Sequence, residues 1–273
     1  MSTPLRHLAA VTGFVLALGA APAASQESPW ILFPEPRVFP RLLADGTAPG
    51  ISINKDLRNR TWIGGIGGLA PVLQYRSGPW TFQAGIGANV FASLNRKPKL
   101  LEVVTADFFV YLPLDIGIGE RLAIRTGYGH YSAHLADDGI EILQLHSVNY
   151  AKDFVPLLCA YRLPEIGGLV YGGMRIDYYT IPATGSNWVA QAGIEAGNLP
   201  LSSWLSAYAA MDLRFKSEVA WAATQSYQIG VKIGTGSAGA VRLAFTVRTG
   251  IDDRGQFFRN RATRHLFGAY LDV

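Results

Sequence analysis

Apolar and polar residues alternate with a period of two along most of the chain beyond residue 50. In residues 80–90 the even positions are apolar or small and the odd ones mostly polar, and residues 121–128 repeat the pattern. A period of two is the signature of a β-strand whose two faces meet different surroundings. Other stretches with this alternation are residues 104–116, 174–178, 227–233, 241–248 and 265–273. The pattern predicts an all-β protein with about twelve strands.

Turn signals separate these strands, and the predicted connections alternate between short and long. The short ones lie at residues 76–79, 118–120, 164–167, 197–200 and 235–239. Most of the others are longer or more charged and lie at residues 95–100, 136–141, 181–187 and 251–261, with a tight link near Glu218 as the exception. Short turns at one end, longer loops at the other and an even strand number are typical of bacterial outer-membrane barrels. The sequence therefore predicts a transmembrane, antiparallel, up-and-down β-barrel.

A soluble sandwich would alternate in the same way, and three features favour the membrane. Lysine is scarce for a soluble surface in a chain that is 49% hydrophobic. The apolar faces end in aromatic residues, as interfacial girdles do. These residues are Trp62, Trp80, Tyr178, Tyr208 and Trp221. The third feature is an N-terminal export signal. Beyond this signal no segment approaches the ~18–20 apolar residues of a membrane helix, so the chain is not expected to span a membrane as helices.

The N-terminal region predicts export. Residues 8–21 form a short apolar run after a basic start, and small residues follow it. This is the pattern of a secretory signal peptide, predicted as residues 1–25 with cleavage between Ala23 and Gln26. Residues 26–49 contain five prolines, which favour extended chain without a ladder. We expect this segment to lie in the periplasm against a barrel mouth, with residues 50–273 as the barrel in the cell outer membrane.

Charge and cysteine content exclude two alternatives. The net charge of +4 is spread along 273 residues, which does not indicate a nucleic-acid-binding protein. The single Cys159 excludes an internal disulfide, and its apolar neighbours indicate a buried or lipid-facing thiol.

One predicted strand carries polar residues on its apolar face. Leu122 and Ile124 share their parity with His130 and Ser132, and the strand direction places this pair at the outer-leaflet rim. Residues two apart on one strand face are ~6.5–7 Å apart, so an imidazole and a hydroxyl can approach hydrogen-bond distance. A serine needs such a base to act as a nucleophile. Polar residues are also ordinary at a membrane interface, so the pair has a catalytic and an interfacial interpretation.

The lumen-facing positions carry many charged residues. They can line a small-solute pore, or they can pair across strands and fill a narrow barrel, because buried charges need partners. We favour the filled barrel and predict the pairs Arg175 with Glu195 and Asp212 with Lys232. Loop positions are also basic, and either solvation or contact with lipopolysaccharide phosphates explains them. These residues are Arg96, Lys97, Lys99, Arg254, Arg259 and Arg261. A calcium site at Asp137, Asp138 and Asp153 lacks the spacing of a calcium loop.

The order of several segments carries a family resemblance. The segments are FPRLLAD, GHYSAHLADD, VNYAKD, QAGIEAG, AAMDLRFKSE with WAATQSYQIGVKIG, and DDRGQFF. On these segments the chain resembles the outer-membrane family called domain of unknown function 1207, from about Phe39 to the end. It departs from the family pattern at Gly46 and Thr47, where Pro-Arg is usual, at Ala133 and at Asp138. The resemblance implies a barrel in the outer membrane and carries over no established activity.

A looser resemblance concerns the segment His130-Tyr131-Ser132. Outer-membrane phospholipase A and the lipid A 3-O-deacylases are similar in carrying His-x-Ser on a lipid-facing barrel strand. The deacylases follow it with Asp-Gly-Ile-Glu, which this chain has from Asp138 to Glu141 at a shorter spacing. The resemblance implies Ser132 as nucleophile, His130 as base and Glu141 as the orienting carboxylate.

The sequence therefore predicts an outer-membrane β-barrel of unestablished role whose lumen is filled by ion pairs. The alternatives are a serine lipid hydrolase acting at the outer leaflet and a small-solute pore. The expected partners are outer-membrane lipids, lipopolysaccharide and, during insertion, the barrel-assembly machinery. Neither nucleic acid nor a cofactor or metal is expected, and the oligomeric state is left open.

Overall fold

The computed structural model describes residues 28–234 and 240–272, which form one sheet of thirteen strands. The predicted signal peptide and the predicted turn at residues 235–239 lie outside the described residues. The strands are β1 (Trp30–Leu32), β2 (Ile51–Asp56), β3 (Thr61–Ser77), β4 (Trp80–Lys97), β5 (Leu100–Ile118), β6 (Leu122–Leu135), β7 (Tyr150–Leu163), β8 (Gly168–Ile181), β9 (Trp188–Pro200), β10 (Leu205–Lys216), β11 (Ala222–Ile233), β12 (Ala240–Ile251) and β13 (Arg261–Asp272).

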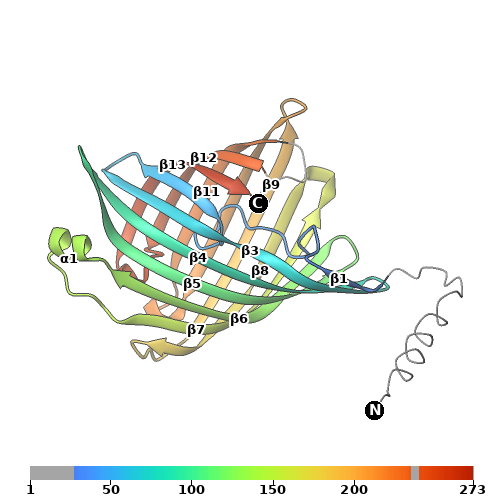
Figure 1. The fold of residues 1–273 in the computed structure, drawn as a ribbon, viewed down its shortest axis with the longest axis horizontal. Coiled ribbons are helices and arrows are strands. Elements are labelled where there is room, and N and C mark those ends of the chain that lie inside the picture. The colour runs from blue at the N-terminus through green and yellow to red at the C-terminus, as the bar shows by residue number, and fades with distance from the viewer. Residues whose placement is uncertain (1–27, 235–239, 273) are drawn as a thin grey trace, which may run out of the picture.

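Strands β2 to β13 close into a barrel (Figure 1). Each pairs antiparallel with its neighbours in sequence, β13 pairs with β2, and β3 pairs with both β2 and β4. The prediction of an all-β antiparallel barrel with about twelve strands is confirmed. Closure leaves the twelve strands without a free edge, which removes the tendency of exposed edges to pair with other chains.

Helices are few and short. They are α1 (Asp137–Leu143), η1 (Pro164–Ile166), η2 (Ser217–Val219) and η3 (Gly255–Phe257). In the described part of the chain, no helix has the length and apolar character needed to cross a membrane.

The two faces of the wall differ in the way that the alternation predicts. Outward side chains are apolar and exposed, as at Ile86, Leu157 and Ile229, which are 53%, 58% and 61% exposed. Inward side chains are largely polar and buried, as at Asp107 and Gln74. This is the reverse of a soluble protein, in which apolar residues collect inside and polar residues collect outside.

Two predicted connections are placed differently in the structure. Strands β4 and β5 run through the predicted loop at residues 95–100 and leave only residues 98 and 99 between them. Asn95 and Lys97 both contact Glu102 across this hairpin, and these contacts hold the strand ends together. The turn predicted at residues 197–200 lies instead at residues 201–204, because β9 continues to Pro200.

The N-terminal segment runs inside the barrel. Phe39 is 1% exposed and packs against Ala123 and Tyr171, and Leu43 packs against Tyr208. The prediction that this segment packs on a mouth is therefore wrong for residues 38–50. The prediction of chain without a ladder is wrong for β1, which pairs with β3.

Lumenal side chains supply the hydrogen bonds that a sheet would otherwise give this segment. The amide of Leu43 donates to Glu195 Oε1 at 2.6 Å, and the amide of Gly50 donates to Asn89 Oδ1 at 2.8 Å. A proline-rich chain makes few ladder contacts, so its remaining amides need such acceptors. Sequence alternation indicates which wall residues face inward, but it does not show that a segment elsewhere in the chain uses them.

The connection between β12 and β13 also folds inward, at the end of the barrel where α1 lies (Figure 1). The side-chain amide of Gln256 donates to the carbonyls of Ala133 and Val148 at 2.6 and 2.7 Å. The amide of Gly255 donates to the lumenal Asp107, and Phe258 packs on Tyr150 with ring centroids 5.0 Å apart. This connection therefore fills part of the barrel mouth.

Candidate functional site

His130 and Ser132 lie two residues apart on the outward face of β6. In β6 the even positions from 122 to 134 are more exposed than the buried lumenal residues Ala123, Gly129 and Ala133. The neighbouring strands place Val110 beside His130 and Ala151 beside Ser132. The alternation in the sequence correctly predicts that both side chains point away from the lumen.

A carboxylate from the next strand contacts the imidazole. Asp153 stands directly opposite His130 in the register of β6 with β7, and its Oδ1 lies 2.6 Å from His130 Nδ1. Tyr128 donates its hydroxyl to the same oxygen at 3.2 Å. The His130 side chain is 40% exposed and that of Asp153 is 23% exposed, so the pair is accessible from outside the barrel.

The structure places Glu141 elsewhere. It lies in α1, which follows the end of β6 and packs beside β5, with the Asp138 carboxylate accepting the amide of Val103 at 2.9 Å. Asp153 approaches His130 from the opposite neighbour, β7. Among the described contacts of Glu141, none reaches His130.

Sequence reasoning missed Asp153 as a partner of the imidazole. The signal was present, because Asp153 shares its parity with Val155 and Leu157 and is thus a charged residue in an apolar stripe. What the sequence lacks is the β6–β7 register, since the 14 residues between these strands do not set it. Asp137, Asp138 and Asp153 do not gather, and the described residues contain no group of three or more metal-ligand side chains.

This arrangement has the parts of a serine nucleophile with its base. Contact between Asp153 and Nδ1 favours the imidazole tautomer with its free lone pair on Nε2. Ser132 follows on the same face at the two-residue strand spacing of ~6.5–7 Å between Cα atoms. Within the described residues no hydrogen bond joins Ser132 to His130, and such contacts are often long before substrate binds.

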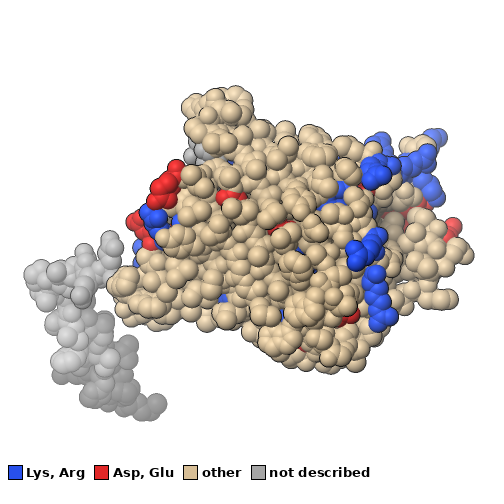
Figure 2. All heavy atoms as spheres, turned by 180° about the vertical axis from the view of Figure 1, so that it is seen from behind, with Lys and Arg blue, Asp and Glu red and all other residues tan. Residues whose placement is uncertain are grey.

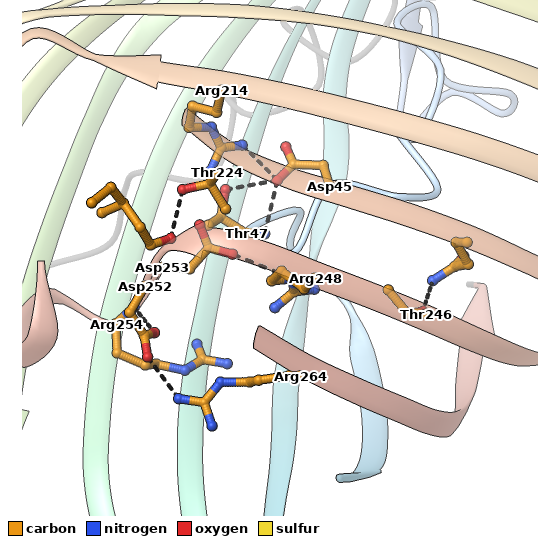
Figure 3. Close-up of polar contacts among 12 residues, drawn as sticks. Asp45, Thr47, Arg214, Thr224, Thr246, Arg248, Asp252, Asp253, Arg254 and Arg264 are labelled. Atoms are coloured by element: carbon orange, nitrogen blue, oxygen red, sulfur yellow. Dashed lines mark hydrogen bonds and ion pairs between the residues drawn. The ribbon is translucent and has the colours of Figure 1, made fainter. Parts of the chain in front are cut away.

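A second polar constellation lies in the lumen, where the N-terminal segment meets the wall (Figure 3). Arg214 of β10 donates to Asp45 at 2.6 Å, and both side chains are at most 10% exposed. Gln191 of β9 and the hydroxyl of Thr47 also donate to the Asp45 carboxylate. Burial alone would raise the pKa of Asp45, but Arg214 together with the Thr47 amide holds this pKa below its ordinary value.

The inward connection between β12 and β13 joins the same constellation (Figure 3). Asp253 pairs with Arg248 at 3.4 Å, and Asp252 pairs with Arg264 at 2.6 Å. The Arg248 guanidinium lies against Gly46, where a Cβ atom would be 2.3 Å from the guanidinium carbon. Arg248 therefore contacts both inward segments, and a side chain at position 46 would displace its guanidinium.

Other lumenal charges pair across strands, as the sequence predicts. Arg125 makes two hydrogen bonds of 2.7 Å to Asp115, its register partner on β5. Lys152 of β7 contacts Asp177 of β8 at 3.0 Å. Ion pairs between side chains of the chain itself therefore occupy much of the interior.

The two individual pairs predicted from the sequence are wrong. Arg175 contacts Asp177, two residues away on its own strand, at 2.6 Å. Asp212 accepts hydrogen bonds from Tyr171 and Gln191 rather than pairing with Lys232. The physical reason is register, because Arg175 stands opposite Val189 instead of Glu195. Arg254, predicted as a loop charge, is 3% exposed and lies over the Phe91 ring.

These features define a closed antiparallel β-barrel of twelve strands whose lumen is occupied by its own N-terminal segment and by one inward connection. The chain belongs to the family described as "Protein of unknown function (DUF1207)", which it matches over residues 73–272. The match spans most of the barrel wall and begins after the N-terminal segment. Comparison with curated proteins gave no match.

Proposed function

We propose that the protein is a barrel of the bacterial outer membrane with a lumen closed by its own chain. The observation that carries this proposal is the outer surface, where exposed apolar side chains belong to consecutive strands around the wall. On β5 alone, Phe108, Val110, Leu112 and Leu114 are 42–48% exposed. Soluble monomers rarely expose continuous apolar patches above a few hundred Å². Lipid contact explains a surface of this kind.

The proposal is tested by expressing the full chain in a Gram-negative host and separating the membranes. The expected result is a protein in the outer-membrane fraction that resists carbonate extraction. It should also migrate differently in gels before and after heating, because a closed barrel stays folded in cold detergent. Recovery of folded protein from the soluble fraction without detergent would contradict the proposal.

The filled lumen gives the small-solute pore no support. Phe39, Leu42 and Leu43 are each at most 8% exposed inside the wall, so the segment packs tightly against its surroundings. A cavity of about 110 Å³ beside it is lined by Phe39, Arg125 and other residues of the segment and the wall. Such a space holds a few water molecules.

A second function, hydrolysis of membrane lipid esters, is favoured by the contact of 2.6 Å between His130 and Asp153. In this proposal the Ser132 hydroxyl oxygen attacks the ester carbonyl carbon while its proton passes to His130 Nε2. The tetrahedral intermediate collapses, and the departing alcohol takes that proton. Water then repeats both steps, releasing the fatty acid and restoring Ser132. Asp153 positions the imidazole and stabilises its charged form, the role of the aspartate in serine triads.

Acyl release from phospholipid and lipopolysaccharide tests this second proposal. Ser132→Ala and His130→Ala should remove activity, while Ser186→Ala, at an exposed serine between β8 and β9, should not. Asp153→Asn should lower kcat by ~10²–10⁴ and shift its pH profile, because the imidazole loses its preferred tautomer. Glu141→Gln should leave activity unchanged. Equal, background-level release from the wild type and Ser132→Ala excludes the hydrolase.

A further inference from the structure

One sector of the barrel end near α1 exposes only basic charge. Three connections meet there, those between β2 and β3, β4 and β5, and β12 and β13, and they are adjacent because β13 pairs with β2 and β3 with β4. The exposed basic residues on these connections and on the adjoining strand ends are Arg58, Arg60, Arg96, Lys97, Lys99, Arg259 and Arg261. The acidic residues nearest in sequence are buried: Asp56 and Glu102 are 0% and 5% exposed, and the Asp253 side chain is 5% exposed. We call these seven residues the basic rim.

The opposite end of the barrel carries mixed charge. There Arg121 contacts Glu165 at 2.7 Å, and both side chains are about half exposed or more. In Figure 2 blue atoms gather in two clusters at the right-hand end with a few red atoms near them, whereas red lies directly beside blue at the left. Acidic residues of α1 border the basic rim on its β5 side. The positive sector is therefore local, and it faces outward above β2, β3 and β4.

An apolar groove lies directly below the basic rim on the outer face of the wall. Its apolar lining is formed by Ile53, Trp62, Leu94, Leu100 and Leu101, and it is an open hollow of about 520 Å³. Leu100 and Leu101 are 57% and 53% exposed. The same groove is lined at its upper edge by Arg96, Lys97 and Lys99. Cations thus stand above an exposed hydrocarbon surface.

We propose that this groove binds a phosphorylated lipid, with its phosphate on the basic rim and an acyl chain along Trp62 and Leu101. Charge complementarity supports an anionic headgroup, and guanidinium and ammonium groups are the side chains that bind phosphate best. Lys97 forms an ion pair with Glu102, whereas Arg96 and Lys99 form none within the described part of the chain. These two are therefore the groove cations available to a phosphate. The site rests on the proposed location in the outer membrane, where such lipids surround the wall.

Binding of bisphosphorylated lipid A to the purified barrel in detergent, followed by native mass spectrometry, tests the site. Arg96→Gln/Lys99→Gln should weaken binding about tenfold, because each cation near a membrane phosphate contributes to affinity. The matched control Arg76→Gln/Arg121→Gln removes two exposed charges at the opposite end and should bind like the wild type. Dephosphorylated lipid A should bind weakly to all three proteins, and inorganic phosphate at 10 mM, on the order of ordinary buffer strength, should not compete.

Leu101→Asn tests the apolar half of the groove and should also weaken lipid A binding. Equal binding by wild type and Arg96→Gln/Lys99→Gln, or equal binding of the dephosphorylated lipid, would overturn the proposal. Each variant is first shown to be a folded, heat-modifiable barrel. Loss of the lipid site on a folded membrane barrel therefore leaves the membrane proposal standing, while a soluble protein overturns both.

Discussion

On the inner face of β6, Arg125 makes two hydrogen bonds to Asp115 and lies 4.4 Å from the centre of the Phe39 ring. On the outer face of the same strand, His130 meets the single carboxylate of Asp153 and is 40% exposed. The first charge is enclosed on several sides by wall and N-terminal segment, and the second is enclosed on one. The comparison separates charges that hold the fold together from charges that remain available to a ligand or substrate.

This difference follows from what surrounds each face. A charge in the lumen has lost water on all sides and must find its partners within the chain. A charge at the outer rim keeps part of its solvation, so pairing there contributes little stability. If the comparison is right, substitutions should lower stability steeply inside the barrel and hardly at all outside.

Arg214 is the residue whose replacement we expect to cost most. Its side chain is 7% exposed and contacts Asp45 at 2.6 Å, so Arg214→Met leaves a buried carboxylate without its cation. Removing one partner of a buried ion pair costs ~3–5 kcal/mol. Urea unfolding in detergent, followed by tryptophan fluorescence, measures the change in the free energy of unfolding. Arg214→Met/Asp45→Leu should recover part of the loss, and a loss under ~1 kcal/mol for the single variant would contradict the assignment.

Gly129 tests the packing of the inner face without a change of charge. A Cβ atom at this position would lie 2.1 Å from a ring carbon of Phe154, which covers the glycine from β7. Gly129→Ala should therefore lower stability by ~1–3 kcal/mol, as overpacking does. The control is Gly68→Ala, where nothing lies within 4 Å of the added atom. Replacing Phe154 with leucine should rescue Gly129→Ala, and an equal loss in both alanine variants would show that the ring is not the cause.

Acid should weaken the attachment of the N-terminal segment to the inner face of the barrel. The pKa of Asp45 is raised by its burial but lowered more by Arg214 and the Thr47 amide, so its folded value lies below the ordinary one. Its stabilisation is therefore complete above the ordinary pKa of ~3.9 and is lost as the pH falls through the lower folded pKa. We expect a smaller loss of stability than in Arg214→Met, because protonation removes the charge of Asp45 but leaves its hydrogen-bonding groups in place.

Pepsin cleavage within residues 28–50 between pH 4 and pH 2 measures this release. Asp45→Asn carries no titrating carboxyl at this position, so it should be cleaved more readily at pH 4 and change less as the pH falls. The same acid dependence in both proteins would assign the release to other carboxylates.

The barrel and the facing of its residues could be predicted from the sequence, because a period of two is a local property of each strand. The outward position of His130 and the inward position of Arg125 follow from parity alone. Partners could not be predicted, since a cross-strand pair depends on register, and loops do not encode it. The sequence motif points to Glu141, whereas the register brings Asp153 to His130.

The N-terminal segment shows a second limit. Its prolines correctly indicate a chain that mostly stays out of the sheet, yet nothing local reveals that Phe39 enters the lumen. That position depends on acceptors such as Asn89 and Glu195, which lie far along the chain. Alternation therefore predicts the wall of a barrel better than it predicts what fills it.

The outer face should respond least, and Tyr128→Phe is its sharpest test. The Tyr128 hydroxyl donates to Asp153 at 3.2 Å from a residue that is 38% exposed, so its loss should change the free energy of unfolding by less than ~0.5 kcal/mol. Asp153→Asn keeps the shape and should cost at most ~1 kcal/mol, the upper range for exposed ion pairs. Both are measured in the same urea titration as Arg214→Met. A loss of ~3 kcal/mol in either variant would place the outer pair with the lumenal ones, as part of the fold. If neither variant changes the free energy of unfolding, the contact between His130 and Asp153 is not needed for the fold. A chemical role then explains this contact best.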